Sequence, residues 1–359
     1  MNSPTLTEFG SEILIDILGH DKFLAEVARS LSAGRMHHAW LLSGPVGIGK
    51  ASMARLAAAW LLSDGVQPGA FFGLGRTDTG IDVKDSSAGQ VLKGAHPDYK
   101  IIAPQTEENK SGQIKIEQIR GLLPFMMHKP GRGGWRVAII DSMDNINRNA
   151  ANALLKLLEE PPEKAVLFLI ASQIGHLPPT IRSRCRLVRM TRLSDDACMS
   201  ALGRKWPNAD KKQLEILGKL SQGAPGQAIN LADSGAADLY QVACTLLQSS
   251  PLDQPALANL CAKWGRGTAS GRATRAGAVF CVGRLLRHAA LWASKIKVDE
   301  LCSFEIPVIE RLATNHSAEQ LARLHDEFVK NAVNAERLYL DFPRFLERHL
   351  TKIYEKSLL

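Results

Sequence analysis

A glycine-rich segment near the N-terminus has the pattern of a phosphate-binding loop. Residues Gly44 to Lys50 read GPVGIGK and fit the pattern G-x-x-x-x-G-K. Glycines allow backbone N–H groups to converge on phosphates, and the helix that follows directs its positive end toward them. The Lys50 ammonium would reach the β- and γ-phosphates of a nucleotide. The motif therefore predicts a nucleotide site, and the alternative is a glycine turn that serves only close packing.

Two residues that ATP hydrolysis needs are missing from this pattern. Ala51 stands where a Ser or Thr hydroxyl would bind magnesium, and Ser52 is rotated by about 100° around a helix from that position. A strand ends in Asp141, which could hold magnesium, but Ser142 follows where hydrolysing proteins have a glutamate base. Asp144 is either a helix cap or a substitute acid. We therefore expect weak magnesium binding and little hydrolysis.

A second basic motif lies at residues 178–186, which read PPTIRSRCR. One interpretation is a solvated basic edge, and the other is that Arg184 is offered to the phosphate of a neighbouring molecule. A guanidinium is always charged and makes paired, planar contacts with phosphate oxygens. Such an arginine finger can contribute several orders of magnitude in rate. Cys185 is expected to be a packed small residue rather than a nucleophile.

Strands and helices alternate around these motifs. A parallel sheet with helices on both faces is the architecture that this alternation predicts. Strands are expected at 39–42, 135–141, 165–172 and 187–190, and helices at 21–31, 50–62, 114–123 and 149–160. Two short helices are expected in residues 1–36. Residues 63–98 are rich in Gly, Asp and Ser and are interpreted as a long irregular insert.

The strands stop near residue 191, and helical patterns fill the rest of the chain. A small helical bundle is expected at 194–235, broken at residues 223–226, and a larger helical region follows. Ser317 and Gln320 have the spacing of a capping box. The fold class is therefore α/β plus all-α. The predicted domains are a parallel-sheet domain at 1–190, a small helical domain at 191–237 and a helical domain at 238–359.

Composition narrows the function and the compartment. The 359 residues include 44 Lys and Arg against 36 Asp and Glu, a net charge of +8, which indicates either a basic surface or a polyanionic partner. None of the six cysteines precedes residue 185, and no two have C-x-x-C spacing, so we expect neither zinc nor disulfides. The first residues do not resemble a signal peptide, and no apolar stretch of about 18 residues occurs. A reduced cytoplasm and no membrane partner are expected.

Several segments together resemble the clamp-loader AAA+ proteins, which open a ring-shaped sliding clamp and place it on primed DNA. The segments are HAWLLSGPVGIGK, AHPDY, AANALLKLLEEPP, TIRSRC and NAERLYLDFPRFLERHL. The resemblance spans nearly the whole chain and is strongest over 38–62 and 135–186. It implies a RecA-like AAA+ domain, a helical lid and a helical collar that joins a ring of subunits.

The resemblance also implies roles for individual residues. The phosphate-loop positions are Gly44, Gly47, Gly49 and Lys50, followed by Ala51; Asp141 is the Walker B aspartate, Ser142 replaces the catalytic glutamate, and Ser172 is the sensor-one residue. Ser183, Arg184 and Cys185 form the SRC motif, in which Arg184 is the finger that acts on a neighbour. Gly226 stands where active subunits carry a sensor-two arginine.

A subunit with an incomplete pocket and an intact finger is expected to be a stator, which has no ATPase activity when it is alone. The resemblance implies that it is part of a DNA polymerase III holoenzyme. Its implied partners are the gamma or tau motor subunits and a delta subunit, with the sliding clamp and primed DNA reached through the complex. Weak binding of ATP or ADP is possible. Residues 63–94 lack the four cysteines of the family's zinc module. The alternatives are a catalytically active ATPase subunit and a DNA-binding scaffold.

Overall fold

The computed structural model describes residues 20–63, 86–104, 112–131, 134–264, 269–298, 301–338 and 340–355. The chain divides into two compact units, Met1–Pro207 (unit 1) and Asn208–Leu359 (unit 2). The helix expected before residue 20 and most of the predicted insert lie outside the described residues. The sequence predicted three domains, with boundaries at 190 and 237, where the structure has two compact units. The three-domain division stays a prediction.

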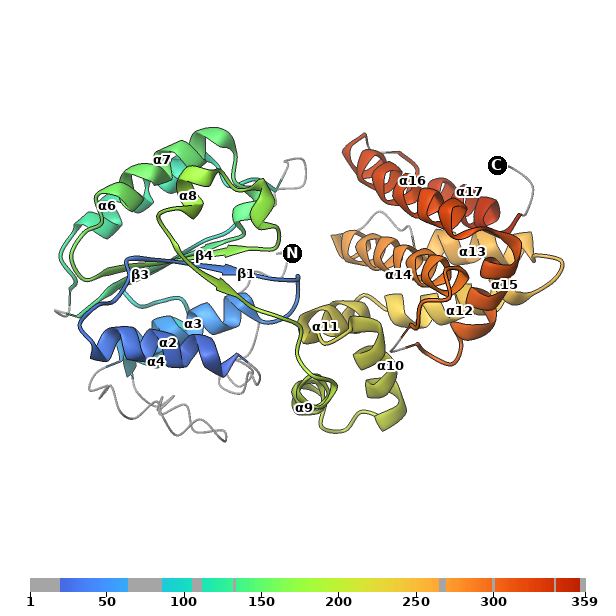
Figure 1. The fold of residues 1–359 in the computed structure, drawn as a ribbon, viewed down its shortest axis with the longest axis horizontal. Coiled ribbons are helices and arrows are strands. Elements are labelled where there is room, and N and C mark those ends of the chain that lie inside the picture. Colours follow the sequence, from blue (N-terminus) through green and yellow to red (C-terminus); the bar gives the residue numbers. More distant parts are fainter. Residues whose placement is uncertain are drawn as a thin grey trace. The chain divides into compact units, whose positions relative to one another are not determined.

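Unit 1 is built on a parallel five-stranded sheet in the order β2-β3-β4-β1-β5 (Figure 1). The strands are β1 Ala39–Ser43, β2 Tyr99–Ile102, β3 Arg136–Asp141, β4 Ala165–Ala171 and β5 Arg186–Arg189. Every residue of β1 and β4 is buried, as expected of apolar strands covered on both faces. Because all the strands run parallel, the loops after β1, β3 and β4 lie together at the carboxyl ends of the strands.

Helices cover both faces of this sheet. Figure 1 shows α2, α3 and α4 on one face and α6, α7 and α8 on the other. The helices of unit 1 up to the last strand are α2 Asp21–Ser32, α3 Lys50–Leu62, α4 Ser86–Leu92, α5 Ile116–Arg120, α6 Leu122–Met127, α7 Arg148–Glu159 and α8 Pro179–Arg182; short 3-10 helices span Met143–Asn145 and Ile174–His176. Helix α9 Asp195–Lys205 follows β5 and does not cover the sheet. The α/β fold predicted from the sequence is confirmed.

Three local predictions need correction. Residues 86–92 form α4 inside the segment interpreted as irregular, because Ala88, Val91 and Leu92 supply a buried helical stripe. Strand β2 was not predicted as an element. The helix expected at 114–123 is two short helices that meet at Gly121.

In the part of unit 2 that the structure describes, every regular element is a helix. The helices are α10 Lys211–Ser221, α11 Pro225–Asp233, α12 Ala236–Gln248, α13 Gln254–Trp264, α14 Ala269–Ala293, α15 Ile306–Asn315, α16 Ala318–Arg337 and α17 Phe342–Tyr354. The long α14 packs against α12, α15 and α16. Ser317 and Gln320 form the predicted capping box at the start of α16.

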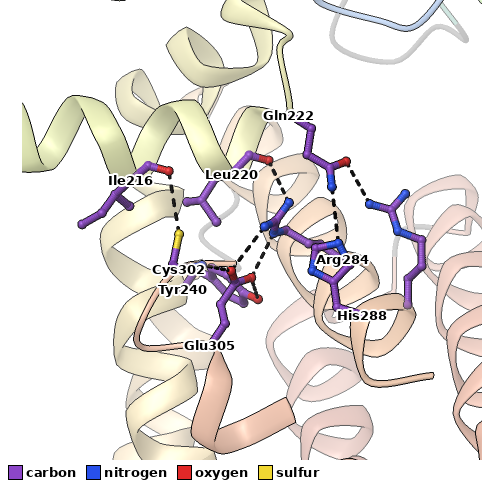
Figure 2. A network of polar contacts seen from close by, with 9 residues as sticks. Ile216, Leu220, Gln222, Tyr240, Arg284, His288, Cys302 and Glu305 are labelled. Atoms are coloured by element: carbon purple, nitrogen blue, oxygen red, sulfur yellow. Dashed lines mark hydrogen bonds and ion pairs between the residues drawn. The ribbon is translucent and has the colours of Figure 1, made fainter. Parts of the chain in front are cut away.

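A buried ion pair holds several of these helices together (Figure 2). Arg284 on α14 donates from Nε to Glu305 Oε1 at 2.9 Å and from Nη2 to Oε2 at 3.2 Å. Tyr240 on α12 donates its hydroxyl to the same carboxylate at 2.8 Å, and the Cys302 amide donates at 2.7 Å. Arg284 also donates to the carbonyl of Leu220 on α10. The pair therefore links α10, α12, α14 and the start of α15.

Candidate functional site

The phosphate loop lies between β1 and α3, as the motif predicts. Gly47 and Gly49 have φ values of +82° and +97°, a backbone region that favours glycine. A Cβ atom on Gly44 would lie 2.1 Å from the carbonyl oxygen of Met190, so only glycine fits at that position. The three glycines are therefore required by the shape of the loop itself. Its strand–loop–helix context matches a phosphate cradle.

The Lys50 ammonium is turned back onto its own loop. Its Nζ atom donates to the carbonyl oxygens of Gly44 at 2.7 Å and Pro45 at 2.6 Å, and the residue is buried. Burial lowers the pKa of Lys50, while the negative charges of Asp141 and Asp144 oppose that shift. Binding of a phosphate through Lys50 would therefore require these two carbonyl contacts to be exchanged.

Two further residues support this region and were not found from the sequence. The His20 ring contacts the Ile48 carbonyl through Nε2 at 2.9 Å, and burial lowers the pKa of His20, which favours a neutral ring that donates from Nε2. Arg55 is buried on α3. Its positive charge lies close enough to Asp141 to lower the pKa of that carboxyl, and no sequence motif pointed to it.

Asp141, predicted as the Walker B aspartate, is half-buried and has positive neighbours. Burial raises the pKa of Asp141, and the nearby charges of Lys50 and Arg55 lower it in part. Ala51 offers no hydroxyl at the magnesium position, and Ser52 is the next residue along α3. A magnesium ion held here would have Asp141 as its acidic ligand and would lack the usual hydroxyl ligand. The residues present therefore fit that ion poorly.

Asp144 ties the loop after β3 to the end of β4. Its Oδ2 atom accepts from Ser142 Oγ at 2.7 Å, from the Ser172 amide at 2.7 Å and from Ser172 Oγ at 2.9 Å, and Oδ1 accepts from the Gln173 amide at 3.0 Å. Burial alone would raise the pKa of Asp144, but these hydrogen bonds outweigh it and lower the pKa. An acid with a lowered pKa is a weak base.

This arrangement corrects the expected role of Asp144 as a helix cap. The Ser142 hydroxyl caps the 3-10 helix by accepting from the Asp144 amide, while the Asp144 carboxylate accepts from Ser172, the residue predicted at the sensor-one position. The structure therefore brings Ser142, Asp144 and Ser172 together at the carboxyl ends of the strands, where Lys50 and Asp141 also lie. The sequence could not indicate this role, because it depends on contacts between the loops after β3 and β4, which are far apart in the chain.

Arg184 lies at the opposite end of the strands, near their amino ends. It precedes β5, whose first residue Arg186 pairs with Trp40 near the amino end of β1, whereas the phosphate loop follows the carboxyl end of β1. The length of β1, about 3.3 Å per residue, separates the two. The arginine and the loop of one chain therefore lie at opposite ends of the strands.

The Arg184 guanidinium is 37% exposed and has contacts within unit 1. Nη2 pairs with Glu159 Oε1 at 2.9 Å, and Nη1 donates to the Thr180 carbonyl at 3.0 Å. Ser183 donates its hydroxyl to the same carbonyl at 3.2 Å. Cys185 is partly buried against the core of unit 1, and burial raises its pKa to about 12. The expectation that Cys185 packs rather than reacts is consistent with this thiol.

Metal and membrane features were sought in the described part of the chain. It contains no cluster of three or more His, Cys, Asp or Glu side chains that could hold a metal ion. The predicted absence of a zinc module stays a prediction, because residues 64–85 lie outside the described ranges. None of the helices described is both long enough and apolar enough to cross a membrane.

Comparisons with known proteins find similarity to subunits of DNA polymerase III. A family model described as DNA polymerase III, delta subunit, matches residues 19–194. The delta' subunit of Pseudomonas aeruginosa is 38% identical over 55% of this chain and 56% of its own length. That of Yersinia pestis is 29% identical over 79% of this chain and 78% of its own length. The tau subunit of Escherichia coli is 31% identical over 62% of this chain and 33% of its own length.

A solved structure of a gamma subunit-related protein from Thermotoga maritima covers 95% of this chain and 100% of its own, with 17% identity and a TM-score of 0.45. Unit 1, with a parallel sheet and a phosphate loop between β1 and α3, has the arrangement of a P-loop nucleotide-binding domain. The chain is similar to the delta' subunits of DNA polymerase III, and the delta-subunit family model matches just under half of it. Its match to the Pseudomonas aeruginosa relative spans about half the length of that protein.

Proposed function

We propose that this chain is a clamp-loader subunit that completes the ATP site of a neighbouring subunit without hydrolysing ATP itself. The observation that carries the proposal is the position of Arg184. It lies near the amino ends of the strands, whereas the chain's own phosphate loop follows the carboxyl end of β1. Its side chain is partly exposed. An arginine placed there cannot serve its own nucleotide, and it is available to one bound by a neighbour.

The chain's own pocket supports the second half of the proposal. Hydrolysis needs a metal ligand at the position of Ala51 and a base at the position of Ser142, and neither residue type supplies it. Asp144 is the nearest substitute base, but its carboxylate already accepts hydrogen bonds from Ser142 and Ser172. The pocket therefore lacks a free base as well as a complete metal site.

The pocket still has the glycines of a phosphate cradle, so we propose weak nucleotide binding with little dependence on magnesium. The free energy of binding must compensate for the two carbonyl contacts of Lys50, which keeps the affinity low. Calorimetric titration of the full chain with ADP, with and without magnesium, measures both properties. Affinity that rises more than about tenfold on adding magnesium, a difference of roughly 1.4 kcal/mol, would contradict this proposal.

The partners proposed for the chain follow from its relatives. Proteins similar to it are named as delta', gamma and tau subunits of DNA polymerase III. We therefore propose a hetero-oligomeric ring with gamma or tau motor subunits and a delta subunit. In that ring the chain supports ATP-dependent loading of the sliding clamp onto primed DNA.

The finger is tested by Arg184→Ala in the reconstituted complex. A finger supplied to a neighbour contributes about 10³- to 10⁵-fold to turnover, so the variant should abolish the contribution of the one ATP site that it completes. Arg182→Ala is the matched control, because Arg182 is an exposed arginine two residues away on α8. Single-turnover ATP hydrolysis by the complex is the measurement, and unchanged hydrolysis by the Arg184 variant would remove the finger role.

Hydrolysis by the chain itself is tested separately. The purified full chain should turn over ATP far more slowly than about 1 s⁻¹, the lower end of typical enzymes. Turnover at or above that rate would favour the alternative of an active ATPase subunit. Substitution of Lys50 by Ala should then abolish it, which distinguishes the chain's own pocket from a contaminating enzyme.

A further inference from the structure

Glu159 connects two segments that lie 25 positions apart in the sequence, the end of α7 and the SRC motif. It is the last residue of α7, and its Oε1 atom lies 2.9 Å from Nη2 of Arg184. The preceding residues Leu157 and Leu158 are buried in the core of unit 1. Pro161 and Pro162 follow directly and prevent the helix from continuing. The carboxylate therefore projects from a fixed point on a rigid element.

The contacts of Arg184 leave much of its hydrogen-bonding capacity unused. A guanidinium has five N–H donors in one plane. Glu159 accepts from Nη2, the Thr180 carbonyl accepts from Nη1, and Ser183 Oγ lies 3.5 Å from Nη1. These contacts leave the Nε–H and one N–H of Nη2 for an incoming phosphate, so the phosphate has no need to displace the carboxylate. Two acceptors on different helices also fix the orientation of the guanidinium plane.

We propose that Glu159 is a positioning residue for the arginine finger: it holds the Arg184 guanidinium in a fixed orientation before the neighbour's nucleotide arrives. This inference rests on the proposed role of Arg184 and adds a second residue to it. A free arginine side chain loses rotamer freedom when it binds, and a prior contact reduces that loss. Orientation matters most in the transition state, where small misplacements of a charged group cost much of the rate.

The test compares three variants in the reconstituted complex. Glu159→Ala should lower the single-turnover rate at the neighbouring ATP site roughly tenfold and leave the KM for ATP nearly unchanged, because the contact acts in the transition state. Glu159→Gln keeps an oxygen acceptor and should recover part of the rate. Glu160→Ala is the matched control, since Glu160 is the exposed residue immediately after α7.

A double variant separates this inference from the proposed function. When Arg184→Ala is already present, Glu159→Ala should cause no additional loss, because the positioned group is gone. The inference is overturned if Arg184→Ala lowers the rate but Glu159→Ala leaves it unchanged or raises it. If Arg184→Ala itself has no effect, the proposed finger role fails instead. Circular dichroism of each variant confirms that the fold is retained, and a lower rate with intact folding and no rescue by Gln would also contradict the inference.

Discussion

The two units contain arginine–glutamate pairs of the same length in opposite environments. Arg184 and Glu159 in unit 1 are 2.9 Å apart and 37% and 49% exposed. Arg284 and Glu305 in unit 2 are also 2.9 Å apart but only 1% and 0% exposed. Distance alone therefore says nothing about the role of an ion pair. The environment decides whether the arginine can bind a ligand or only stabilise the fold.

The buried pair is surrounded by partners that satisfy both charges. Burial alone would raise the pKa of Glu305, but hydrogen bonds from Arg284 and its positive charge lower it, helped by the Cys302 amide and Tyr240. Burial likewise opposes the charge of Arg284, and Glu305 raises the pKa of Arg284 in return. Each ion is costly to bury unless the other is present. The exposed pair has no such dependence, because water can replace either partner.

The largest effect that tests this contrast is on the stability of unit 2. Glu305→Ala leaves the Arg284 charge buried without its partner, which typically costs about 3–5 kcal/mol. Hydrogen exchange of peptides from α12 and α14 in the full chain measures the free energy of opening. Glu159→Ala is the control and should change the opening of α7 by less than about 1 kcal/mol. Similar losses in both variants would show that the two pairs do not differ as argued.

Removing both charges of the buried pair sharpens the same comparison. The double variant Arg284→Met with Glu305→Leu replaces the ions by apolar side chains of similar volume. Such replacements are often neutral or stabilising, so the double variant should recover most of the stability that Glu305→Ala loses. A double variant as unstable as Glu305→Ala would mean that Tyr240 and the Cys302 amide need the carboxylate more than Arg284 does.

The next effect is on the pH dependence of unit 2. His288 is buried one turn from Arg284, and burial together with the Arg284 charge lowers its pKa to about 4. Its Nε2 atom lies 3.3 Å from the amide nitrogen of Gln222, which donates to a neutral ring and would repel a protonated one (Figure 2). Arg287 fixes that amide by donating to Gln222 Oε1. The neutral ring is therefore part of the folded structure.

The sign of this dependence follows from the lowered pKa. The unfolded chain binds a proton on His288 below pH 6.5, whereas the folded chain does so only near pH 4. The stabilising contribution is therefore complete above pH 6.5 and is lost as the pH falls to 4, in total about 3 kcal/mol. His288→Gln should remove this part of the pH dependence of urea unfolding, and His176→Gln, on the exposed 3-10 helix of unit 1, should not. Equal pH dependence in all three proteins would contradict the assignment.

The sequence predicted most of the fold, and the reasons are local. Apolar runs identified β1, β3 and β4, and the phosphate-loop motif located the start of α3 at Lys50. The helix stripe in α4 was present in the sequence but was obscured by its Gly- and Ser-rich surroundings. Strand β2 follows directly after the segment interpreted as irregular, and Lys100 interrupts its short apolar run, so it was not recognised.

The sequence predicted the site residues but not what they contact. That Asp144 accepts from Ser172 depends on strands β3 and β4 being neighbours, which no local pattern reveals. The pairing of Arg184 with Glu159 depends in the same way on how α7 and α8 pack. The motif approach also passed over His20 and Arg55, because neither belongs to the spacing of the loop. Residue types predict the chemistry, while tertiary packing decides which charges are already paired.

The smallest effect is the coupling between the two exposed charges. A double-mutant cycle of Arg184→Ala and Glu159→Ala should give a coupling energy of at most about 1 kcal/mol in the unfolding of unit 1 at low salt. Raising the salt from about 0.05 M to about 1 M shortens the Debye length from more than 10 Å to about 3 Å and should remove most of that energy. The corresponding cycle on Arg284 and Glu305 should be nearly independent of salt, because water and ions do not reach that pair. A coupling energy in unit 1 that persists at high salt would contradict the contrast between the two pairs, because it would mean that water and ions do not reach Arg184 and Glu159 either.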